Sequence, residues 1–394
     1  MRQLTKDITQ TAENTTDRKH QSKNNLKNRT TMEEKKTCLY DKHVELGALM
    51  QPFGGFIMPI QYSSIIDEHN AVRQHCGVFD VSHMGEVTVK GPDAERYVNH
   101  IFTNDITGAP VGKIFYGMML YPNGGTVDDL LVYKMEEDAF FLVINAANID
   151  KDVEWMKSHL EGYNVEFANR SEYYGQLAVQ GPEAEQVVEE VLGIECKELV
   201  FYTTKTINNG KEEIIVSRTG YTGEDGFEIY ASHEFIREQW DKLMASGRCK
   251  PCGLGCRDTL RFEVGLPLYG DELSSEISPV MAGLSMFCKL DKPEFIGKEA
   301  LVEQKANGVA KKVVGIELEE KAIPRHGYKV LHEGEEIGEV TTGYHTISSD
   351  KSVCMALVDA RFSKLDTPLE VQIRKKTFKG KVVKKRFYDK HYKK

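Results

Sequence analysis

The sequence predicts an α+β protein with two related α+β units followed by a small all-β domain. Three observations support this fold class: an internal repeat, strand-like runs joined to helical segments, and a change to short alternating runs after residue 311. At 394 residues the chain is too long for one ordinary hydrophobic core. Hydrophobic residues make up 40% and charged residues 28%, which is typical of a globular protein.

Residues 1–31 are polar and show almost no apolar periodicity. Such a composition cannot bury enough apolar surface to order itself, so we expect a disordered polar extension over residues 1–32. The segment lacks the apolar stretch of a signal peptide, and its three acidic residues count against a mitochondrial presequence. Met32 begins an ordinary-looking sequence, so a start site assigned too early would explain the extension.

An internal repeat places the same pattern at residues 85–98 and 175–188. Each copy alternates as a strand, turns at Gly-Pro and enters a helix, where the proline suits the first helical turn. Further along each unit, a strand-like run precedes a helical segment that carries one of the only two tryptophans, Trp155 and Trp240. We therefore expect two related units with a ligand site in the cleft between them.

The segment Lys292–Glu303 marks a boundary, and the chain after it changes character. Six short alternating runs follow, separated by Gly, Pro or charged turns, which is the pattern of a small all-β domain. The runs are Val313–Leu318, Tyr328–Leu331, Ile337–Thr342, Val353–Val358, Leu369–Ile373 and Val382–Val383.

Composition restricts the classes of partner. The net charge of −9 argues against bulk nucleic-acid binding, and no apolar run approaches the roughly 18 residues that a membrane span needs. The eight cysteines are scattered, which favours a reduced, cytoplasmic protein. Cys249, Cys252 and Cys256 could supply three zinc ligands, but no fourth ligand is evident nearby. We expect packed side chains there and no metal.

The segment Ser217–Glu228 contains three glycines and two threonines between its ends and reads as a tight loop leading into a strand. It ends with Glu228 on a run, Phe227–Tyr230, that otherwise looks buried. A buried acid costs several kcal/mol unless something pairs with it, so Glu228 is a candidate binding residue.

The segment Pro122–Tyr133 begins with Asn-Gly-Gly, a strong hairpin turn signal, and continues with adjacent acids at the start of a strand. Because side chains alternate along a strand, Asp128 and Asp129 should point to opposite faces. We expect one of them to serve the turn or solvent and the other to enter the cleft.

Two further segments hold candidate polar side chains. Asp80, Ser82 and His83 invite comparison with a catalytic triad, but no nucleophile-elbow motif supports it, and satisfied polar groups at a strand start are the expected outcome. Arg257 and Arg261 share a helix face. Arg257 could bind a carboxylate or carbonyl group of a ligand; a surface arginine pair is the alternative.

The C-terminal segment is strongly basic. It is one solvated face of a strand pair or a docking surface for an acidic partner; nucleic-acid binding carries less weight, because no nucleic-acid-binding motif accompanies the run. Its basic residues are Arg374, Lys375, Lys376, Lys379, Lys381, Lys384, Lys385 and Arg386.

Four ordered segments together resemble the aminomethyltransferase family of the glycine cleavage system, the T-protein family. They are His75–Met84, Asn123–Leu130, Gly220–Glu228, and Arg257–Arg261 with Leu268–Asp271. The resemblance covers residues from about Leu39 to about Tyr392. It implies a folate-binding region over residues 33–305, built from two interleaved lobes, and a C-terminal β-barrel domain over residues 306–394.

The resemblance also implies an activity and a site. A lipoyl arm on the acidic H-protein carries an aminomethyl group, whose methylene passes to tetrahydrofolate as ammonia leaves, giving 5,10-methylenetetrahydrofolate. Asp129 takes the catalytic role, and Glu228, Arg257 and Tyr392 bind the folate. The residues implied to line its site are Met84, Tyr116, Leu131, Tyr133, Asn145 and Tyr221.

Other families with this fold carry sequence motifs that this chain lacks. A folate-binding factor for tRNA modification and iron–sulfur assembly would carry Lys-x-Cys-Tyr-x-Gly-Gln-Glu, whereas Lys292–Glu299 lacks the cysteine. Dehydrogenases with such a folate domain would carry a nucleotide-binding glycine motif, which is missing. A folate- or lipoyl-carrier-binding module without turnover is disfavoured by the presence of both Asp129 and Glu228.

Overall fold

The computed structural model describes residues 34–393, and the elements discussed below belong to one unit that begins at Lys36. The predicted disordered extension, residues 1–32, lies outside the described residues. Strand β1 spans Lys35–Lys36. Among the residues described, no helix has the length and apolar character needed to cross a bilayer.

The first lobe is built on a six-stranded sheet of order β11-β12-β13-β10-β4-β14, in which only β4 and β14 are parallel neighbours. Helices α6 and α7 contact β10 and β13, and Trp240 of α7 is buried in the core between them. The bounds are β4 Gly77–Asp80, β10 Tyr174–Gln180, β11 Thr204–Asn208, β12 Glu213–Ser217, β13 Gly226–Ser232, β14 Lys250–Pro251, α6 Ala184–Glu190 and α7 His233–Ser246.

The second lobe is built on a five-stranded antiparallel sheet of order β6-β7-β8-β5-β9. Helix α4 contacts β5 and β8, and Trp155 of α5 packs against the same core. The bounds are β5 Gly85–Lys90, β6 Ile114–Leu120, β7 Thr126–Glu136, β8 Ala139–Ile144, β9 Glu166–Asn169, α4 Ala94–Ile101 and α5 Ile149–Lys157.

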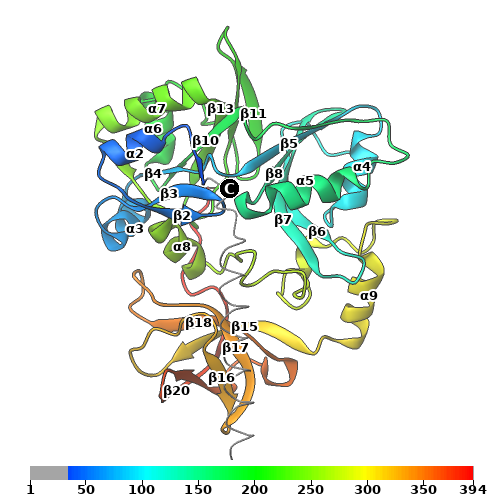
Figure 1. Ribbon diagram of the computed structural model, residues 1–394, viewed down its shortest axis with the longest axis vertical. Coiled ribbons are helices and arrows are strands. Elements are labelled where there is room, and N and C mark those ends of the chain that lie inside the picture. The colour runs from blue at the N-terminus through cyan, green and yellow to red at the C-terminus, as the bar shows by residue number, and fades with distance from the viewer. Residues whose placement is uncertain (1–33, 394) are drawn as a thin grey trace, which may run out of the picture. The chain divides into compact units, whose positions relative to one another are not determined.

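The predicted repeat and the predicted interleaving are both confirmed. Strand β5 leads into α4 and pairs with β8, which precedes α5; likewise β10 leads into α6 and pairs with β13, which precedes α7. Strand β4 belongs to the first sheet although it precedes β5–β9 in the chain, so the lobes exchange segments. Figure 1 shows the two sheets side by side.

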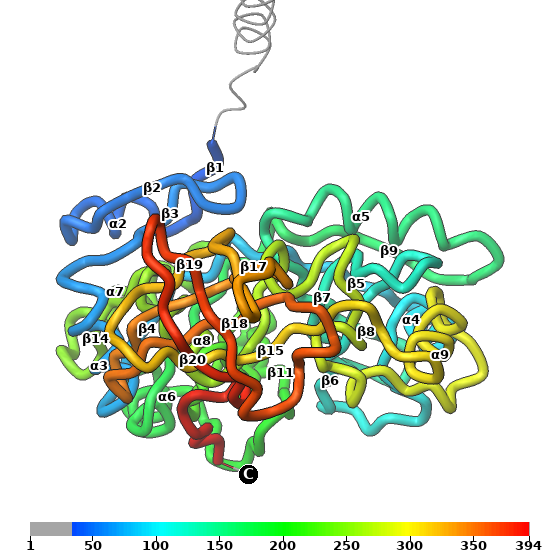
Figure 2. Tube along the Cα trace, turned by 90° about the horizontal axis from the view of Figure 1, so that it is seen from below, coloured from blue at the N-terminus to red at the C-terminus, as the bar shows by residue number. Residues whose placement is uncertain are grey.

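The C-terminal domain is a closed barrel in the order β15-β18-β17-β16-β19-β20. All six predicted runs are strands, and the last is longer than predicted because exposed lysines alternate with its inward residues. Figure 2 looks onto the barrel, whose strands lie mainly in front of the first lobe in this view. The bounds are β15 Lys311–Leu318, β16 Lys329–His332, β17 Glu335–His345, β18 Ser352–Asp359, β19 Pro368–Ile373 and β20 Lys376–Val383.

Helix α8 connects the first lobe to the barrel. It packs on α3 and β3, and its Arg261 donates to the Thr342 hydroxyl of β17 at 3.2 Å. The fold is thus α+β with a C-terminal barrel, as predicted. The remaining bounds are α2 Tyr40–Glu45, β2 Leu49–Phe53, β3 Phe56–Gln61, α3 Ile65–Gln74, η1 Ala146–Asn148, α8 Leu254–Glu263, η2 Ser285–Phe287, α9 Lys298–Asn307 and η3 Ala360–Phe362.

Candidate active site

The Asn-Gly-Gly turn joins β6 to β7 and presents the two adjacent acids, as predicted. Asp128 serves neither the turn nor solvent, because it is completely buried. It accepts hydrogen bonds from the Asn145 N–H at 3.0 Å, the Asn145 side chain at 2.8 Å and the Asn148 side chain at 2.8 Å. Burial, and then Asp128, raises the pKa of neighbouring Asp152 to about 11, and Lys151, whose Nζ lies 3.3 Å from Asp152 Oδ1, opposes the shift.

Asp129 points to the opposite face of β7 and is only partly buried. The Tyr116 hydroxyl donates to Asp129 Oδ2 at 2.8 Å, and Asn145 Nδ2 donates to Oδ1 at 3.1 Å. Burial of the carboxyl, and then the charge of Asp128, raises the Asp129 pKa to about 7, while these two donors oppose the shift. Asp129 is therefore a fixed carboxyl group that is about half ionised at neutral pH.

The register of β6 and β7 explains why several predicted residues share one face. Asp129, Leu131 and Tyr133 alternate along β7 with intervening residues that face the lobe core. Tyr116 lies opposite Leu131, so it is the diagonal neighbour of Asp129. The ring of Tyr116 packs edge-on against Phe287 at 4.8 Å.

Glu228 on β13 is 8% exposed and is held by two donors. Gln176 Nε2 donates to Oε1 at 3.0 Å, and the Thr219 hydroxyl donates to Oε2 at 2.5 Å. Burial raises the Glu228 pKa, and Thr219, Arg257 and Gln176 oppose that shift. Gln176 Oε1 is buried without a partner in the described part of the chain.

The glycine-rich loop before Glu228 wraps around the side chain of Gln180. Gln180 Nε2 donates to the Thr219 carbonyl oxygen at 2.9 Å, and the Thr222 hydroxyl donates to Gln180 Oε1 at 2.8 Å. A Cβ at Gly220 would lie 1.9 Å from Gln180 Oε1, and one at Gly226 would lie 2.4 Å from its Nε2. Glycine is therefore required for this close approach, which fixes Thr219 beside Glu228.

The two arginines of α8 differ in their partners. Arg261 is buried and forms ion pairs with Asp258 at 2.7 Å and Glu272 at 2.9 Å. Because Glu272 lies outside α8, this pair joins the helix to the segment that follows it. The guanidinium of Arg257 lies over the Tyr221 ring at 4.6 Å. Within residues 34–393 we find no hydrogen-bond acceptor or ion-pair partner for it. The alternative of a surface arginine pair is wrong.

The two carboxyl groups Asp129 and Glu228 act on the same neighbour. The negative charges of both raise the pKa of Tyr202, although burial is the main cause. The Tyr133 hydroxyl of β7 bonds that of Tyr230 of β13 at 2.8 Å, which joins the facing sides of the two sheets. Met84 and Leu131 pack against this aromatic junction. The structure thus brings the predicted residues of both lobes into one neighbourhood.

Tyr392 reaches this region on the C-terminal tail. The His391 N–H donates to the Gly223 carbonyl oxygen at 2.8 Å, so the tail lies along the glycine-rich loop. The ring of Tyr392 stacks on Phe201 at 4.0 Å with an interplanar angle of 13°. Tyr392 also acts electrostatically on Tyr202.

Sequence reasoning missed Tyr202, Gln176 and Thr219. Tyr202 has a positive φ of 63°, which is rare for an aromatic residue and follows from the loop that holds it. Gln176 had a usable signal, because the internal repeat aligns it with Glu86 and both are polar residues inside buried strands.

The remaining candidates are structural. The Asp80 carboxylate accepts hydrogen bonds from the Thr37 hydroxyl at 2.6 Å and from the Ser82 N–H at 2.9 Å, and it lies 2.8 Å from His43 Nε2. Burial lowers the pKa of His83 to about 3, and the ring packs against aromatic neighbours rather than against Ser82. These residues form no triad. Over the described residues, no group of three or more His, Cys, Asp or Glu side chains is arranged to hold a metal.

Comparisons with known proteins identify the family. Residues 39–292 match the family described as the GCVT N-terminal domain, and residues 311–389 match the glycine cleavage T-protein C-terminal barrel domain. The aminomethyltransferase of Alkaliphilus oremlandii (strain OhILAs) is 48% identical over 367 residues, covering 92% of this chain and 100% of the relative. That of Lysinibacillus sphaericus (strain C3-41) is 48% identical over 362 residues, covering 91% and 99%.

A solved structure agrees. The glycine cleavage system aminomethyltransferase T from Bartonella henselae superposes with a TM-score of 0.88 at 30% identity, covering 92% of this chain and 100% of that one. The fold and these relatives define an enzyme of the aminomethyltransferase class. The chain belongs to the glycine cleavage T-protein family. The comparisons do not favour the tRNA-modification and iron–sulfur assembly alternative.

Proposed function

We propose that this enzyme transfers the methylene carbon of an aminomethyl group, carried by the lipoyl arm of an H-protein, to tetrahydrofolate. Ammonia is released and 5,10-methylenetetrahydrofolate is formed. The observation that carries the proposal is Asp129, a partly buried carboxyl group fixed by Tyr116 and Asn145 in the neighbourhood of Glu228.

The polar groups around Glu228 fit the edge of a reduced pterin. That edge presents an amino group and a ring N–H side by side, and a carboxylate can accept from both. Glu228 is already oriented by Gln176 and Thr219, and Gln176 Oε1 supplies a further unused acceptor. Arg257, which has no ion-pair partner among the described residues, supplies a cation for the carboxylate or carbonyl groups of the same substrate.

The other proposed folate contacts have supporting positions. Leu131 and Tyr133 share the Asp129 face of β7, while Tyr221 carries the Arg257 guanidinium on its ring. We propose that Tyr392 closes the site from the C-terminal tail. The full proposed set of folate-binding residues is Glu228, Arg257, Tyr392, Met84, Tyr116, Leu131, Tyr133, Asn145 and Tyr221.

Asp129 is proposed to orient the attacking amine of the folate and to stabilise positive charge on the transferred carbon. A fixed carboxylate next to developing positive charge lowers the barrier without reorganising at the moment of reaction. The pKa of about 7 suits this role, because the approach of a cationic group favours the ionised form. No covalent bond between enzyme and substrate is required.

The test is the Asp129→Asn variant, which preserves shape and removes the charge. We expect methylene transfer from aminomethylated H-protein to fall by roughly 100-fold or more, as for loss of a preorganised electrostatic group. Tetrahydrofolate affinity should change little. Asp138→Asn, in an exposed hairpin turn, is the matched control. Activity is measured as ammonia release. Full activity of the Asp129→Asn variant would falsify the catalytic assignment.

The carrier protein is proposed to dock on exposed basic residues of the C-terminal segment, by complementarity with its acidic surface. The prediction that Lys385 belongs to this docking surface is wrong, because Lys385 turns inward and its ammonium donates to the Ala282 carbonyl oxygen. Lys384 and Arg386 on either side are exposed.

We further propose that residues 33–305 bind folate and that residues 306–394 form the barrel domain. We also propose that the enzyme is cytoplasmic, because all eight cysteines are unpaired.

A further inference from the structure

Two cysteines meet where β4 and β14 run side by side, on elements that the proposed reaction does not use. The strands are parallel with Lys250 opposite Gly77, and the Lys250 N–H donates to the Cys76 carbonyl oxygen at 3.0 Å. Cys76 and Cys249 each precede this registered pair by one residue, so they too lie opposite one another. Their Sγ atoms are 3.3 Å apart.

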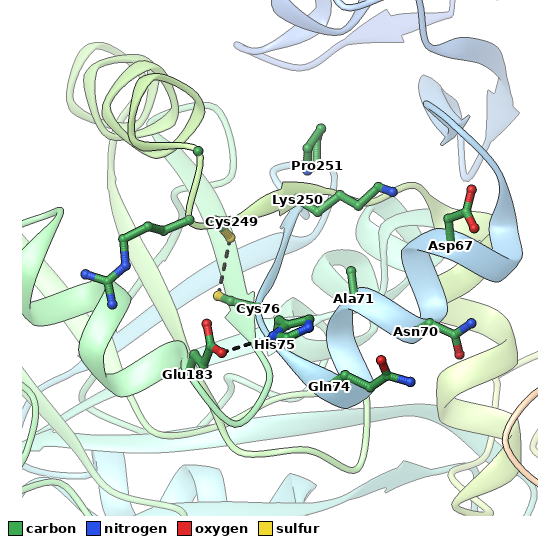
Figure 3. A pocket seen from close by; sticks show the side chains of 12 residues that line it. Asp67, Asn70, Ala71, Gln74, His75, Cys76, Glu183, Cys249, Lys250 and Pro251 are labelled. Carbon is green, nitrogen blue, oxygen red and sulfur yellow. Dashed lines mark hydrogen bonds and ion pairs between the residues drawn. The ribbon is translucent and has the colours of Figure 1, made fainter.

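The same pair borders a cavity of about 710 Å³ that shares no residue with the proposed folate site (Figure 3). Figure 3 shows the two sulfur atoms pointing toward each other. Cys249 is 6% exposed and Cys76 2%. Cys249 is therefore the more exposed residue of the pair. The residues that line the cavity are Asp67, Asn70, Ala71, Gln74, His75, Cys76, Glu183, Gly247, Arg248, Cys249, Lys250 and Pro251.

We propose that Cys76 and Cys249 form a reversible dithiol–disulfide pair, oxidised by a small anionic disulfide that enters this cavity. A disulfide needs its sulfurs at about 2.05 Å and its Cα atoms between about 4.4 and 6.8 Å. Neighbouring strands lie about 4.8 Å apart, which satisfies the second requirement. The first requires the sulfurs to close by about 1.2 Å, which small side-chain rotations can supply.

The exchange proceeds in two balanced steps. The Cys249 thiolate, after losing its proton, attacks one sulfur of the incoming disulfide, and the other sulfur leaves as a thiolate that takes up a proton. The Cys76 thiolate then attacks Cys249 Sγ in this mixed disulfide and displaces the second small thiol. Two cysteine thiols are oxidised to one disulfide, and one small disulfide is reduced to two thiols.

The Lys250 ammonium at the cavity wall can bind an anionic oxidant. Lys250 has no ion-pair partner within the described residues. Arg248 is paired with Glu190, and His75 with Glu183, so among the described residues Lys250 is the cationic lining residue without an ion pair; the Asp67 carboxylate also lines the cavity. A peptide disulfide bearing carboxylates, such as oxidised glutathione, has the matching chemistry.

The neighbouring thiols Cys252 and Cys256 interact with each other and with backbone carbonyl oxygens. Cys252 Sγ bonds the Lys250 carbonyl oxygen at 3.3 Å, and Cys256 Sγ bonds the Gly253 carbonyl oxygen at 3.3 Å. Burial, followed by the neighbouring Cys76, holds the pKa of Cys249 well above its ordinary value. The thiol form therefore predominates, and the exchange should be slow.

The experiment incubates the full chain with oxidised glutathione for hours, followed by alkylation, intact mass measurement and peptide mapping. We expect the loss of two hydrogen atoms and one linked pair of peptides, containing Cys76 and Cys249, which dithiothreitol reverses. The crosslink closes a long loop, so the melting temperature should rise by several degrees. Cys252→Ala should retain the link, whereas Cys76→Ala should stop at a glutathione adduct on Cys249.

Two results overturn the proposal in the wild-type chain, whatever the variants do. One is a link that joins Cys252 to Cys256 or to Cys249 instead. The other is the absence of any link in the folded chain under conditions that link the same cysteines after denaturation.

Discussion

The hydrogen bond from Tyr116 to Asp129 sets the ionisation of the proposed catalytic group. Tyr116→Phe removes only the hydroxyl and keeps the ring that packs on Phe287. Because this donor lowers the Asp129 pKa, its loss should raise that pKa above about 7. The proposed mechanism needs the carboxylate, so activity should rise with pH through this pKa in the wild type and at a higher pH in the variant.

The size of the Asp129 pKa shift follows from the free energy of the Tyr116 hydrogen bond. A hydrogen bond to a charged group contributes about 1.5–3 kcal/mol, and one pKa unit corresponds to about 1.4 kcal/mol. The acidic limb of the kcat/KM profile should therefore move up by roughly one to two units. At pH 7 the ionised fraction falls from about one half to between roughly one tenth and one hundredth, a loss of roughly 5- to 50-fold.

The assay measures kcat/KM for methylene transfer between pH 5.5 and about 9.5. Activity of the variant should recover toward the wild-type plateau at high pH, which a merely structural defect would not produce. Tyr163→Phe, outside the site, is the control and should leave the limb in place. An acidic limb that stays within a few tenths of a unit of the wild type would refute the role of Tyr116.

Three further predictions concern binding, stability and docking. Glu228→Gln keeps the shape but loses the charge, so tetrahydrofolate affinity measured calorimetrically should fall about tenfold or more; unchanged affinity removes Glu228 from the site. A Cβ at Gly125 would lie 1.9 Å from a backbone carbonyl oxygen. Gly125→Ala should therefore cost about 1–3 kcal/mol in urea unfolding, more than Gly210→Ala, where a Cβ meets open space and only the positive φ costs energy. Equal losses would contradict this. Charge reversal of Lys384 and Arg386 should weaken H-protein binding and flatten its salt dependence; if neither changes, docking lies elsewhere.

The fold was predictable where local pattern carries it. The repeat, the two helices with their tryptophans and the six barrel strands follow from alternation and turn residues within short windows. The site was less predictable. Alternation correctly placed Asp128 and Asp129 on opposite faces of the strand. Only the hydrogen bonds from Asn145 and Asn148 to Asp128 show that the face of Asp128 is interior.

Long-range contacts decided the remaining points. The basic C-terminal run reads as one exposed face, yet Lys385 turns inward because the Ala282 carbonyl oxygen, over 100 residues away in the chain, accepts from it. Likewise, Arg261 has ion-pair partners, whereas the Arg257 guanidinium has none among the described residues and lies over the Tyr221 ring, although their spacing gives no hint of the difference.

The sequence by itself determined the class of fold, the order of its elements and the residue types available for chemistry, since these depend on neighbours within a few positions. Tertiary structure alone decided which side chains share an environment. Burial, hydrogen-bond partners and the pKa of Asp129 depend on atoms brought together from β6, β7 and the start of η1, and no local pattern encodes that meeting.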